Sequence, residues 1–556
     1  MGPGVVDSPS VNPKRCLALV TVTFLSAACA VGGLGEDPKD KTVRKGGTLA
    51  VALTPPDQID PSRASNRSGI FVLKQICDTL VAFEPRTGEL KPGIAESWTI
   101  SADAKKISFK IRQGVKFHNG RDLVAEDFVY SLSRFVHPKT GSPQYFFLRR
   151  IVGYQDVREE KTPTLAGVKA TDARTLEIEL SEPFAELPAV LSHPSAGTAV
   201  PKEEVDKSPE AFAAKPVCTG PYLVSLPWSA GQDINLLRFP NYSGTSIAFA
   251  AGGKGYASKI LLRSVPDDEA GYKLFEEKQV QVSNIPVSRL VAARKAKHEV
   301  VSGANGHFAY LGLPVTKPPY DNVNLRKALA AAVDRKAIVE DLLAGTREIP
   351  RSLLPPAAGP AAAGGSCPAL LRPRIDLNTA RTALGASTID PATVKPVVYF
   401  NAGGGHEKWV AKVIDQWQAL GITATAEAQP KAFKEHVDFL VDPGADGPFR
   451  LAWPVKFPSA EALYDPLFTT GSLDNFTRYA SPEFDERMKK ARSTVGDKER
   501  KLAYAEAGAI LCRDAAVIPM WFGRNHVVYS SGNGPAGSRA LDIYGDPVLR
   551  ELGSVP

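Results

Sequence analysis

Hydrophobic and polar residues alternate over short stretches of the chain, which is the pattern of half-buried β-strands. Residues 107–112 (ISFKIR) and 174–180 (RTLEIEL) alternate in this way. Residues 46–53 and 396–400 are short apolar runs, which are typical of buried strands. Since these segments lie far apart in the chain, the pattern predicts strands along its whole length.

Other segments carry apolar residues every three or four positions, the spacing of amphipathic helices. Residues 124–135 (VAEDFVYSLSRF) have this spacing and an acidic first turn, which favours a helix start. The same pattern predicts helices over residues 324–344, 406–420, 482–494 and 498–513. The fold class is therefore mixed α/β. The low-complexity stretch 354–368 (LPPAAGPAAAGGSCP) predicts an exposed loop.

The composition is that of a globular protein, with 43% hydrophobic and 23% charged residues among 556. A chain of this length predicts two to four domains. The net charge of +7, from 67 basic and 60 acidic residues, is small for the length and does not indicate nucleic-acid binding.

The first 28 residues have the layout of a secretory signal peptide. Lys14 and Arg15 precede the nine-residue apolar stretch 17–25, and small residues follow it. That stretch is too short to span a bilayer, which takes about 20 apolar residues. We therefore predict that the mature chain is secreted and that residues 1–28 are removed.

Cys29 directly follows these small residues, which resembles a bacterial lipoprotein signal. Leu25 lies four positions before the cysteine, whereas the usual pattern has leucine three before it. We predict that Cys29 is lipidated and that residues 29–45 form a flexible tether. The protein would then be extracytoplasmic, anchored to the outer face of the cell membrane.

The remaining cysteines are Cys77, Cys218, Cys367 and Cys512. An even number in an oxidising compartment favours disulfides, and spacing alone leaves three connectivities open. No CxxC or Cys/His ligand spacing occurs, so no metal bound through cysteine is expected.

The chain carries none of the familiar catalytic motifs. Its eight histidines include no HExxH pair, and GxSxG, SxxK and GxxxxGK[ST] are all absent. The residues therefore make no positive case for an enzyme or for a bound cofactor.

Residues 89–135 (ELKPGIAESWTISADAKKISFKIRQGVKFHNGRDLVAEDFVYSLSRF) closely resemble the signature region of peptide/oligopeptide/nickel-type solute-binding proteins of ABC importers. The shared positions include Trp98, the run from Gly114 to His118, and Asp127. Further family-like blocks follow in order: Gly220-Pro221-Tyr222, Pro319-Tyr320-Asp321, Asp334-Arg335, Ser481-Pro482-Glu483-Phe484-Asp485 and Ile518-Pro519. The resemblance covers roughly residues 46–530.

This resemblance implies a two-lobed periplasmic-binding-protein-like fold (class II, large cluster) with an additional domain on lobe one. Lobe one would comprise residues 46–80, 188–295 and 515–556, the extra domain 81–187, and lobe two 296–514. A monomer of this kind closes its lobes around a small-molecule or peptide ligand. It then docks on the permease of an importer powered by ATPase subunits, with no chemistry on the ligand.

Two other functions remain open. The same fold serves a ligand-sensing or envelope-regulatory binding protein that is not coupled to transport. A secreted hydrolase on this scaffold is the third reading, although no motif indicates one.

In peptide-binding members of the resembled family, a Trp-x-x-Asp stretch anchors the ligand, and the Asp pairs with the peptide's amino terminus. The matching residues here are Arg450, Trp453 and Lys456, with lysine in place of the Asp. Two facing ammonium groups repel, so binding of an ordinary peptide amino terminus is disfavoured. Lys456 could instead pair with an anionic ligand, bind a neutral hydroxyl-rich ligand such as a glycan, or point to solvent. Trp453 could stack on a ligand or pack in the core.

Four further positions, Tyr145, Pro314, His118 and His406, gain a meaning from the resembled family. Tyr145 matches a region near the mouth of the ligand cleft. Pro314 stands where members often have Asn, so one polar contact would be lost. Nothing in the sequence pairs His118 and His406 with each other as metal ligands, so no metal site is expected.

The family order places Cys77 with Cys218 in lobe one, and Cys367 with Cys512 in lobe two, which implies these two disulfides.

Overall fold

The computed structural model describes residues 45–244, 254–359, 367, 370–429, 432–442, 444–531 and 541–553. All of them belong to one compact unit, Lys41–Pro556. The predicted signal peptide (1–28), Cys29 and the tether up to residue 44 lie outside the described residues. Within the described ranges, no helix is both long enough and apolar enough to cross a membrane.

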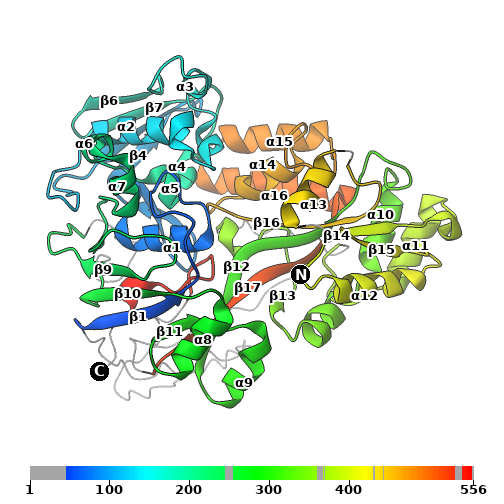
Figure 1. The fold of residues 1–556 in the computed structure, drawn as a ribbon. Coiled ribbons are helices and arrows are strands. Elements are labelled where there is room, and N and C mark those ends of the chain that lie inside the picture. Colours follow the sequence, from blue (N-terminus) through cyan, green and yellow to red (C-terminus); the bar gives the residue numbers. More distant parts are fainter. Residues whose placement is uncertain are drawn as a thin grey trace, which may run out of the picture. The chain divides into compact units, whose positions relative to one another are not determined.

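An 11-stranded sheet runs through the unit (Figure 1). Its order is β15-β14-β16-β12-β17-β11-β1-β10-β9-β8, and β13 pairs with β17. The strands are β1 (Thr48–Leu53), β8 (Tyr222–Val224), β9 (Ile234–Arg238), β10 (Lys259–Ser264), β11 (Val282–Asn284), β12 (Glu299–Gly312), β13 (Arg347–Glu348), β14 (Val397–Asn401), β15 (Thr425–Gln429), β16 (Phe449–Pro454) and β17 (Val517–Tyr529).

Strands β12 and β17 join the two halves of this sheet. They pair with each other along most of their length. The carboxyl-terminal half of β12 also pairs with β16, and the carboxyl-terminal end of β17 pairs with β11. The strands on the β11 side come from segments expected in lobe one, and those on the β16 side from segments expected in lobe two. The same two strands therefore connect both sets of segments.

A separate four-stranded antiparallel sheet lies within residues 81–187, in the order β4-β5-β7-β6. Its strands are β4 (Ala95–Ile100), β5 (Lys106–Ile111), β6 (Val168–Asp172) and β7 (Thr175–Glu179), and β2 (Val81–Phe83) pairs with β3 (Leu90–Pro92) nearby. The alternating side chains of Ile107, Phe109 and Ile111 are fully buried. Helix α2 (Ala125–Val136) packs on this sheet. The strands and helix predicted for this part of the chain are confirmed.

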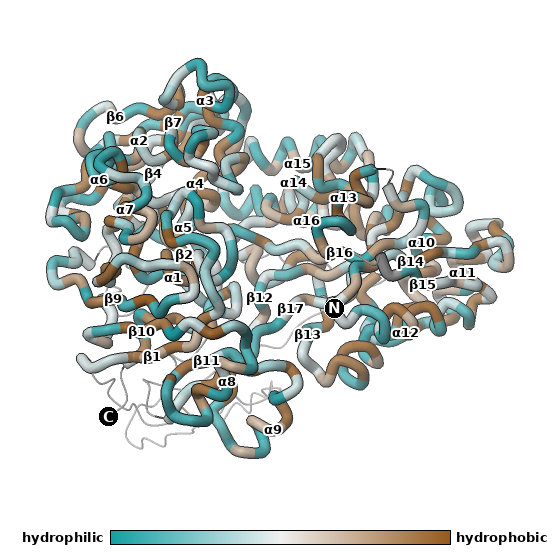
Figure 2. The backbone as a smooth tube through the Cα atoms, in the orientation of Figure 1, coloured by the Kyte–Doolittle hydropathy of each residue, from teal (hydrophilic) through white to brown (hydrophobic). Residues whose placement is uncertain are grey.

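The remaining helices lie around the two sheets, and most of the long ones belong to the second half of the chain. They are α1 (Arg67–Ile76), α3 (Tyr154–Arg158), α4 (Leu187–Val190), α5 (Pro194–Gly197), α6 (Lys202–Lys207), α7 (Pro209–Ala214), α8 (Asp268–Glu276), α9 (Leu290–Lys295), α10 (Val323–Ala331), α11 (Leu377–Ser387), α12 (Glu407–Gln418), α13 (Phe433–Val441), α14 (Glu461–Phe468), α15 (Pro482–Ser493) and α16 (Asp497–Asp514). Figure 2 shows hydrophobic residues recurring among hydrophilic ones along α12, whose apolar face is buried. The helices predicted at 406–420, 482–494 and 498–513 are confirmed.

The helix predicted over residues 324–344 is wrong as a single element. Helix α10 ends at Ala331, and a separate π-helical turn covers Ala337–Leu342. Between them, the Asp334 carboxylate accepts a hydrogen bond from the backbone N–H of Ala337 at 2.8 Å. Arg335 is fully buried and donates to the carbonyl oxygen of Pro519 at 2.5 Å. A buried guanidinium needs such acceptors, and reaching β17 interrupts the helix.

The exposed loop predicted over residues 354–368 is wrong for residues 357–359 and 367, which are buried, although Pro356 is exposed. Ala357 and Ala358 form part of a buried 3₁₀ turn. Gly359 lies so close to Pro458 that a methyl group added to it would sit 3.0 Å from the Pro458 carbonyl oxygen. The small side chains allow tight packing here rather than marking an excursion. Residues 360–366, 368 and 369 lie outside the described part.

Candidate functional site

The two faces of the sheet around β12 and β16 differ in exposure. On one face, Phe308 and Tyr310 of β12 pack against the core together with Leu451 of β16. On the other face, Leu311 of β12 pairs with Arg450 of β16. His307 lies on that same face of β12, four residues before Leu311. Since side chains alternate between faces along a strand, His307 and Arg450 share the less buried face.

Arg450 is half-buried and has no carboxylate partner among the described residues. Its Nη1 donates to the Asn401 side-chain oxygen at 3.0 Å, at the end of β14. Burial, together with the charge of Arg347, lowers its pKa to about 10 against the influence of Tyr310. A guanidinium in this state is still charged at neutral pH, and its unused N–H groups can bind an anion.

Arg347 enters the same region from β13. Its pairing partner on β17 is Gly523, two residues from Trp521, which itself pairs with Ala309 of β12. This register puts Arg347 on the face that carries His307. The guanidinium donates to the Thr346 carbonyl oxygen at 2.9 Å, and burial lowers its pKa.

Lys456 follows β16 and is also half-buried. The structure shows no hydrogen bond or ion pair to its ammonium group from any described residue. Burial lowers its pKa, and the negative charge of Asp57 partly opposes that effect. The Tyr544 hydroxyl donates to the Lys456 carbonyl oxygen at 3.2 Å. Asp57 and Tyr544 belong to segments expected in lobe one, so Lys456 lies where segments of both expected lobes meet.

His307 lies between these cations. Its side chain is accessible to solvent, yet enough protein surrounds it for burial to lower its pKa to about 4. The charges of Lys456, Arg67, Arg450 and Arg347 contribute to this lowering of the pKa. The imidazole is therefore neutral at pH 7. An accessible ring with four cations around it marks this face as the candidate site.

Trp453 points to the opposite face from Arg450, because the two residues are three positions apart on one strand. Its pairing partner is Phe308, and its Nε1 donates to the Ala462 carbonyl oxygen at 2.9 Å. These contacts favour core packing over stacking on a ligand. Pro314 is buried just after the end of β12.

Tyr145 is not brought next to the other predicted site residues. The Arg158 guanidinium carbon lies 3.7 Å from the centre of its ring. The same 3₁₀ turn, Tyr145–Leu148, places Phe147 against Phe457, with ring centres 5.8 Å apart. The turn therefore approaches the residue after Lys456 through Phe147, while Tyr145 faces α3.

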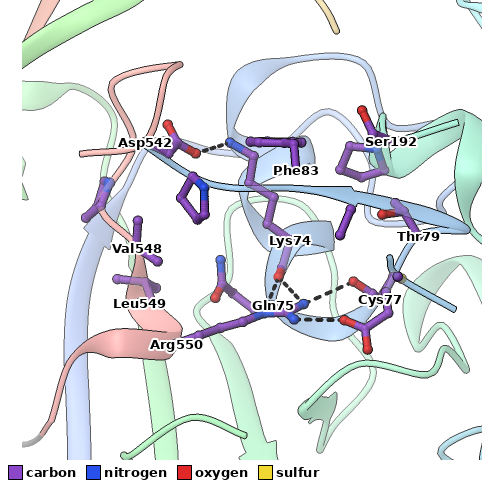
Figure 3. Close-up of a pocket in the computed structure, with 16 residues that line it drawn as sticks. Lys74, Gln75, Cys77, Thr79, Phe83, Ser192, Asp542, Val548, Leu549 and Arg550 are labelled. Carbon is purple, nitrogen blue, oxygen red and sulfur yellow. Dashed lines mark hydrogen bonds and ion pairs between the residues drawn. The ribbon is translucent and has the colours of Figure 1, made fainter. Parts of the chain in front are cut away.

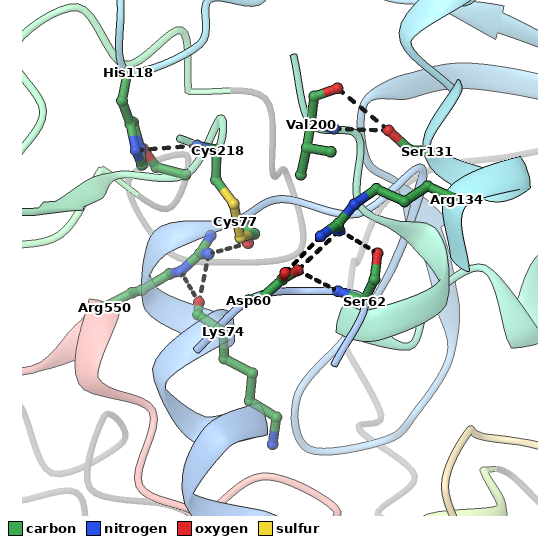
Figure 4. Close-up of a disulfide and its surroundings, with 11 residues drawn as sticks. Asp60, Ser62, Lys74, Cys77, His118, Ser131, Arg134, Val200, Cys218 and Arg550 are labelled. Carbon is green, nitrogen blue, oxygen red and sulfur yellow. Dashed lines mark hydrogen bonds and ion pairs between the residues drawn. A yellow bond between two sulfur atoms is a disulfide. The ribbon is translucent and has the colours of Figure 1, made fainter. Parts of the chain in front are cut away.

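Both disulfides implied by the family order are present. Cys77, at the C-cap of α1, is bonded to Cys218, with a Cα–Cα distance of 4.9 Å (Figure 4). The Cys218 N–H donates to His118 Nδ1 at 3.3 Å, and Arg550 donates to the Cys77 carbonyl oxygen at 3.1 Å. Cys367 is bonded to Cys512, with a Cα–Cα distance of 5.4 Å. Each bridge joins segments of one expected lobe.

His118 and His406, the two histidines considered above as metal ligands, are held by hydrogen bonds to neighbouring residues. The Nε2 atom of His118 lies 3.1 Å from the Gly220 carbonyl oxygen. His406 Nδ1 accepts a hydrogen bond from Trp409 at 3.1 Å. Burial lowers the pKa of each to about 4. Within the described ranges, no group of three or more His, Cys, Asp or Glu side chains could hold a metal ion.

A small cavity of about 70 Å³ is lined by the end of α1, by residues near β2 and by the carboxyl-terminal segment 541–553 (Figure 3). Lys74 of α1 pairs there with Asp542 at 2.7 Å and with Asp546 at 2.8 Å. The cavity has room for a few water molecules, well below the roughly 300–1,000 Å³ of a typical ligand pocket. We therefore interpret this network as an anchor of the carboxyl-terminal segment.

Sequence reasoning identified Arg450 and Lys456 but missed His307, Arg347 and Asp57. The last three come from separate segments, and only the sheet pairing and the loop after β1 bring them close. His307 lies within a strand-like run that includes Phe308 and Tyr310, and this alternation was the one signal that could have put it on an open face.

Comparison with known proteins supports a single family. The model of the bacterial extracellular solute-binding proteins, family 5 (middle), matches residues 89–474. The periplasmic oligopeptide-binding protein OppA of Escherichia coli K12 is 25% identical over 530 residues, covering 91% of each chain. The probable deoxycholate-binding periplasmic protein YgiS of the same organism is 24% identical over 84% of this chain and 86% of its own.

The fold is shared with solved binding proteins. The unliganded open form of the periplasmic murein tripeptide-binding protein MppA superposes with a TM-score of 0.79 at 22% identity. The match covers 93% of this chain and 99% of that one. The predicted two-lobed, mixed α/β periplasmic-binding-protein fold is confirmed.

Proposed function

Because the chain belongs to the bacterial extracellular solute-binding proteins, family 5, we propose that it captures an organic solute between its two lobes and delivers it to an ABC permease. The family consists of binding proteins, not enzymes. Relatives named for oligopeptide and murein tripeptide binding make a peptide-like solute the first candidate. The permease and its ATPase subunits are the expected partners.

The observation that carries the proposal is the arrangement around Lys456. Its ammonium group has no partner among the described residues, and it lies among Asp57, His193 and His307, which come from both expected lobes. Strands β12 and β17 connect those lobes and can act as the hinge. A solute bound here would contact both lobes at once, and binding would then favour the closed form.

We assign Arg450 and Lys456 to direct ligand contact. Trp453 supports the same strand from its core face. Tyr145 lies outside the site, in the turn whose Phe147 packs against Phe457. Outside the cytoplasm, lipidation of Cys29 would hold the protein at the membrane and close to its permease. Incorporation of labelled palmitate by the wild type, and its loss in Cys29→Ala, checks the anchor.

Mass spectrometry of the solutes that co-purify with the mature protein tests the function. We expect one class of solute with the wild type and with the control Lys169→Asp, whose lysine is exposed on β6. The solute should be lost or exchanged in Lys456→Asp. A wild-type protein that carries no solute, and whose Tm no peptide or metabolite of a broad panel raises, would contradict the proposal. Deletion of the gene should then lower uptake of the identified solute, whereas an envelope defect with normal uptake favours the regulatory reading.

A further inference from the structure

Three cationic side chains gather on the accessible side of the β12–β16 face. Arg347, Arg450 and Lys456 make no ion pair with any carboxylate in the part of the chain that the structure describes. Arg450 donates to an amide oxygen and Arg347 to a backbone carbonyl, both neutral acceptors. The positive charge of the region is therefore not neutralised by these contacts.

The strand order explains why the three cations meet. Arg450 lies on β16, which is the neighbour of β12, and Arg347 lies on β13, which pairs with β17 on the other side of β12. The Val455 N–H donates to the Gly306 carbonyl oxygen at 3.0 Å, which keeps the segment leading to Lys456 beside β12. His307 thus lies between a cation on each side.

Asp57, the acidic residue whose charge acts on Lys456, already accepts several hydrogen bonds. Its Oδ1 accepts from the N–H of Gln58 at 2.8 Å. Its Oδ2 accepts from the N–H and the hydroxyl of Ser65 at 3.0 and 2.6 Å, and from the N–H of Asn66 at 3.0 Å. These bonds shape the loop ahead of α1. The Asp57 carboxylate therefore acts on Lys456 only through its charge. The Lys456 ammonium group stays available to bind a ligand.

We propose that the captured solute carries an acidic group, a carboxylate or a phosphate, that binds beside the neutral His307, at the cations Arg347, Arg450 and Lys456 around it. This inference rests on the proposed function and specifies its ligand. Guanidinium and ammonium groups form strong charge-assisted hydrogen bonds to such anions. A free amino terminus would be repelled at the same place, and a neutral glycan would leave three half-buried cations uncompensated.

Isothermal titration calorimetry with a charge series of one tripeptide tests the inference. The series is trialanine, N-acetyl-trialanine, trialanine amide and N-acetyl-trialanine amide, with net charges of −1 for the second and +1 for the third. N-acetyl-Ala-phosphoserine-Ala-amide distinguishes a phosphate from a carboxylate. In the wild type, we expect an acidic member of the set to bind at least about tenfold more tightly than trialanine amide.

Substitution of the cations should remove this preference. Lys456→Gln and Arg450→Gln should each reduce the acid-to-amide affinity ratio to below about threefold, while the control Lys169→Gln keeps the wild-type ratio. The wild-type ratio alone decides the inference if a variant does not fold. Equal or tighter binding of the amide, or no binding of any acidic member, overturns it. A protein that co-purifies with a solute yet prefers the amide keeps the proposed function and loses only this inference.

Discussion

Arg492 donates through Nε to both carboxylate oxygens of Glu461, at 3.0 and 3.1 Å. Arg150 Nη2 lies 3.2 Å from the same carboxylate, and the Tyr504 hydroxyl donates to it at 3.1 Å. Only 2% of the Glu461 side chain is exposed. Arg150 belongs to the expected extra domain, while the other residues belong to expected lobe two. A buried charge cluster therefore joins the two parts.

Substitution of the central carboxylate should weaken this junction strongly. Glu461→Gln removes one of the carboxylates that compensate the buried guanidinium groups of Arg150 and Arg492, Asp465 being the other, so we expect a loss of about 3 kcal/mol in the free energy of unfolding. Urea denaturation measures it. Glu486→Gln, on the exposed side of α15, is the matched control and should cost no more than about 1 kcal/mol. Equal effects of the two substitutions would show that the buried cluster contributes little.

The histidines whose pKa is lowered should make the folded state sensitive to mild acid. Burial lowers the pKa of five of them to about 4 or below: His118, His193, His307, His406 and His526. The unfolded chain takes up protons near pH 6.5, whereas the folded chain does not until about pH 4. The unfolded state then binds more protons, so stability falls as the pH drops from about 6.5 to 4.

His118 allows a test of this dependence at one position. A pKa lowered from 6.5 to about 4 corresponds to at most about 3 kcal/mol lost at low pH. We expect His118→Gln, which keeps hydrogen-bonding atoms but does not titrate, to lose that much less stability than the wild type between pH 7 and pH 4. Parallel pH profiles of the two proteins would contradict the assignment.

The Cys77–Cys218 bridge should contribute mainly to stability rather than to ligand binding. It closes a loop with a sequence separation of 141 residues. A loop of that length corresponds to about 5 kcal/mol in the chain-entropy model. We expect Cys77→Ser/Cys218→Ser to lower the denaturation midpoint clearly. The dissociation constant of the solute should change by less than about threefold, because both cysteines lie within one expected lobe. A large loss of affinity in the folded variant would indicate that the bridge shapes the site.

The position of Trp453 predicts a packing role. Trp453→Phe removes the hydrogen bond to the Ala462 carbonyl oxygen, and we expect a loss of about 1 kcal/mol in stability. Affinity for the solute should remain within about threefold of wild type, since Trp453 and Arg450 point to opposite faces. Calorimetry of the purified variant checks both values. A tenfold loss of affinity at unchanged stability would restore direct stacking on the ligand.

Local pattern was enough to predict several of the regular elements of this protein. Strand β5 has alternating residues with one buried face, and helices α2, α12 and α15 have the spacing of a single apolar stripe. Burial of such a stripe or face is a property of the segment itself, so the sequence alone was enough. Motifs in residues 89–135 were likewise sufficient for the family, and through it for the position of Lys456.

Tertiary structure decided the conformation of segments in which the local pattern conflicts with contacts to residues distant in the chain. The helix expected at 324–344 breaks where Arg335 donates to the Pro519 carbonyl oxygen of β17. Residues 357–359 are buried because small residues fit beside Pro458. The candidate site depends on tertiary structure most of all. His307, Arg347 and Asp57 join Lys456 only through pairing between strands more than a hundred residues apart and through the meeting of the two lobes. No local spacing in the chain records such long-range contacts.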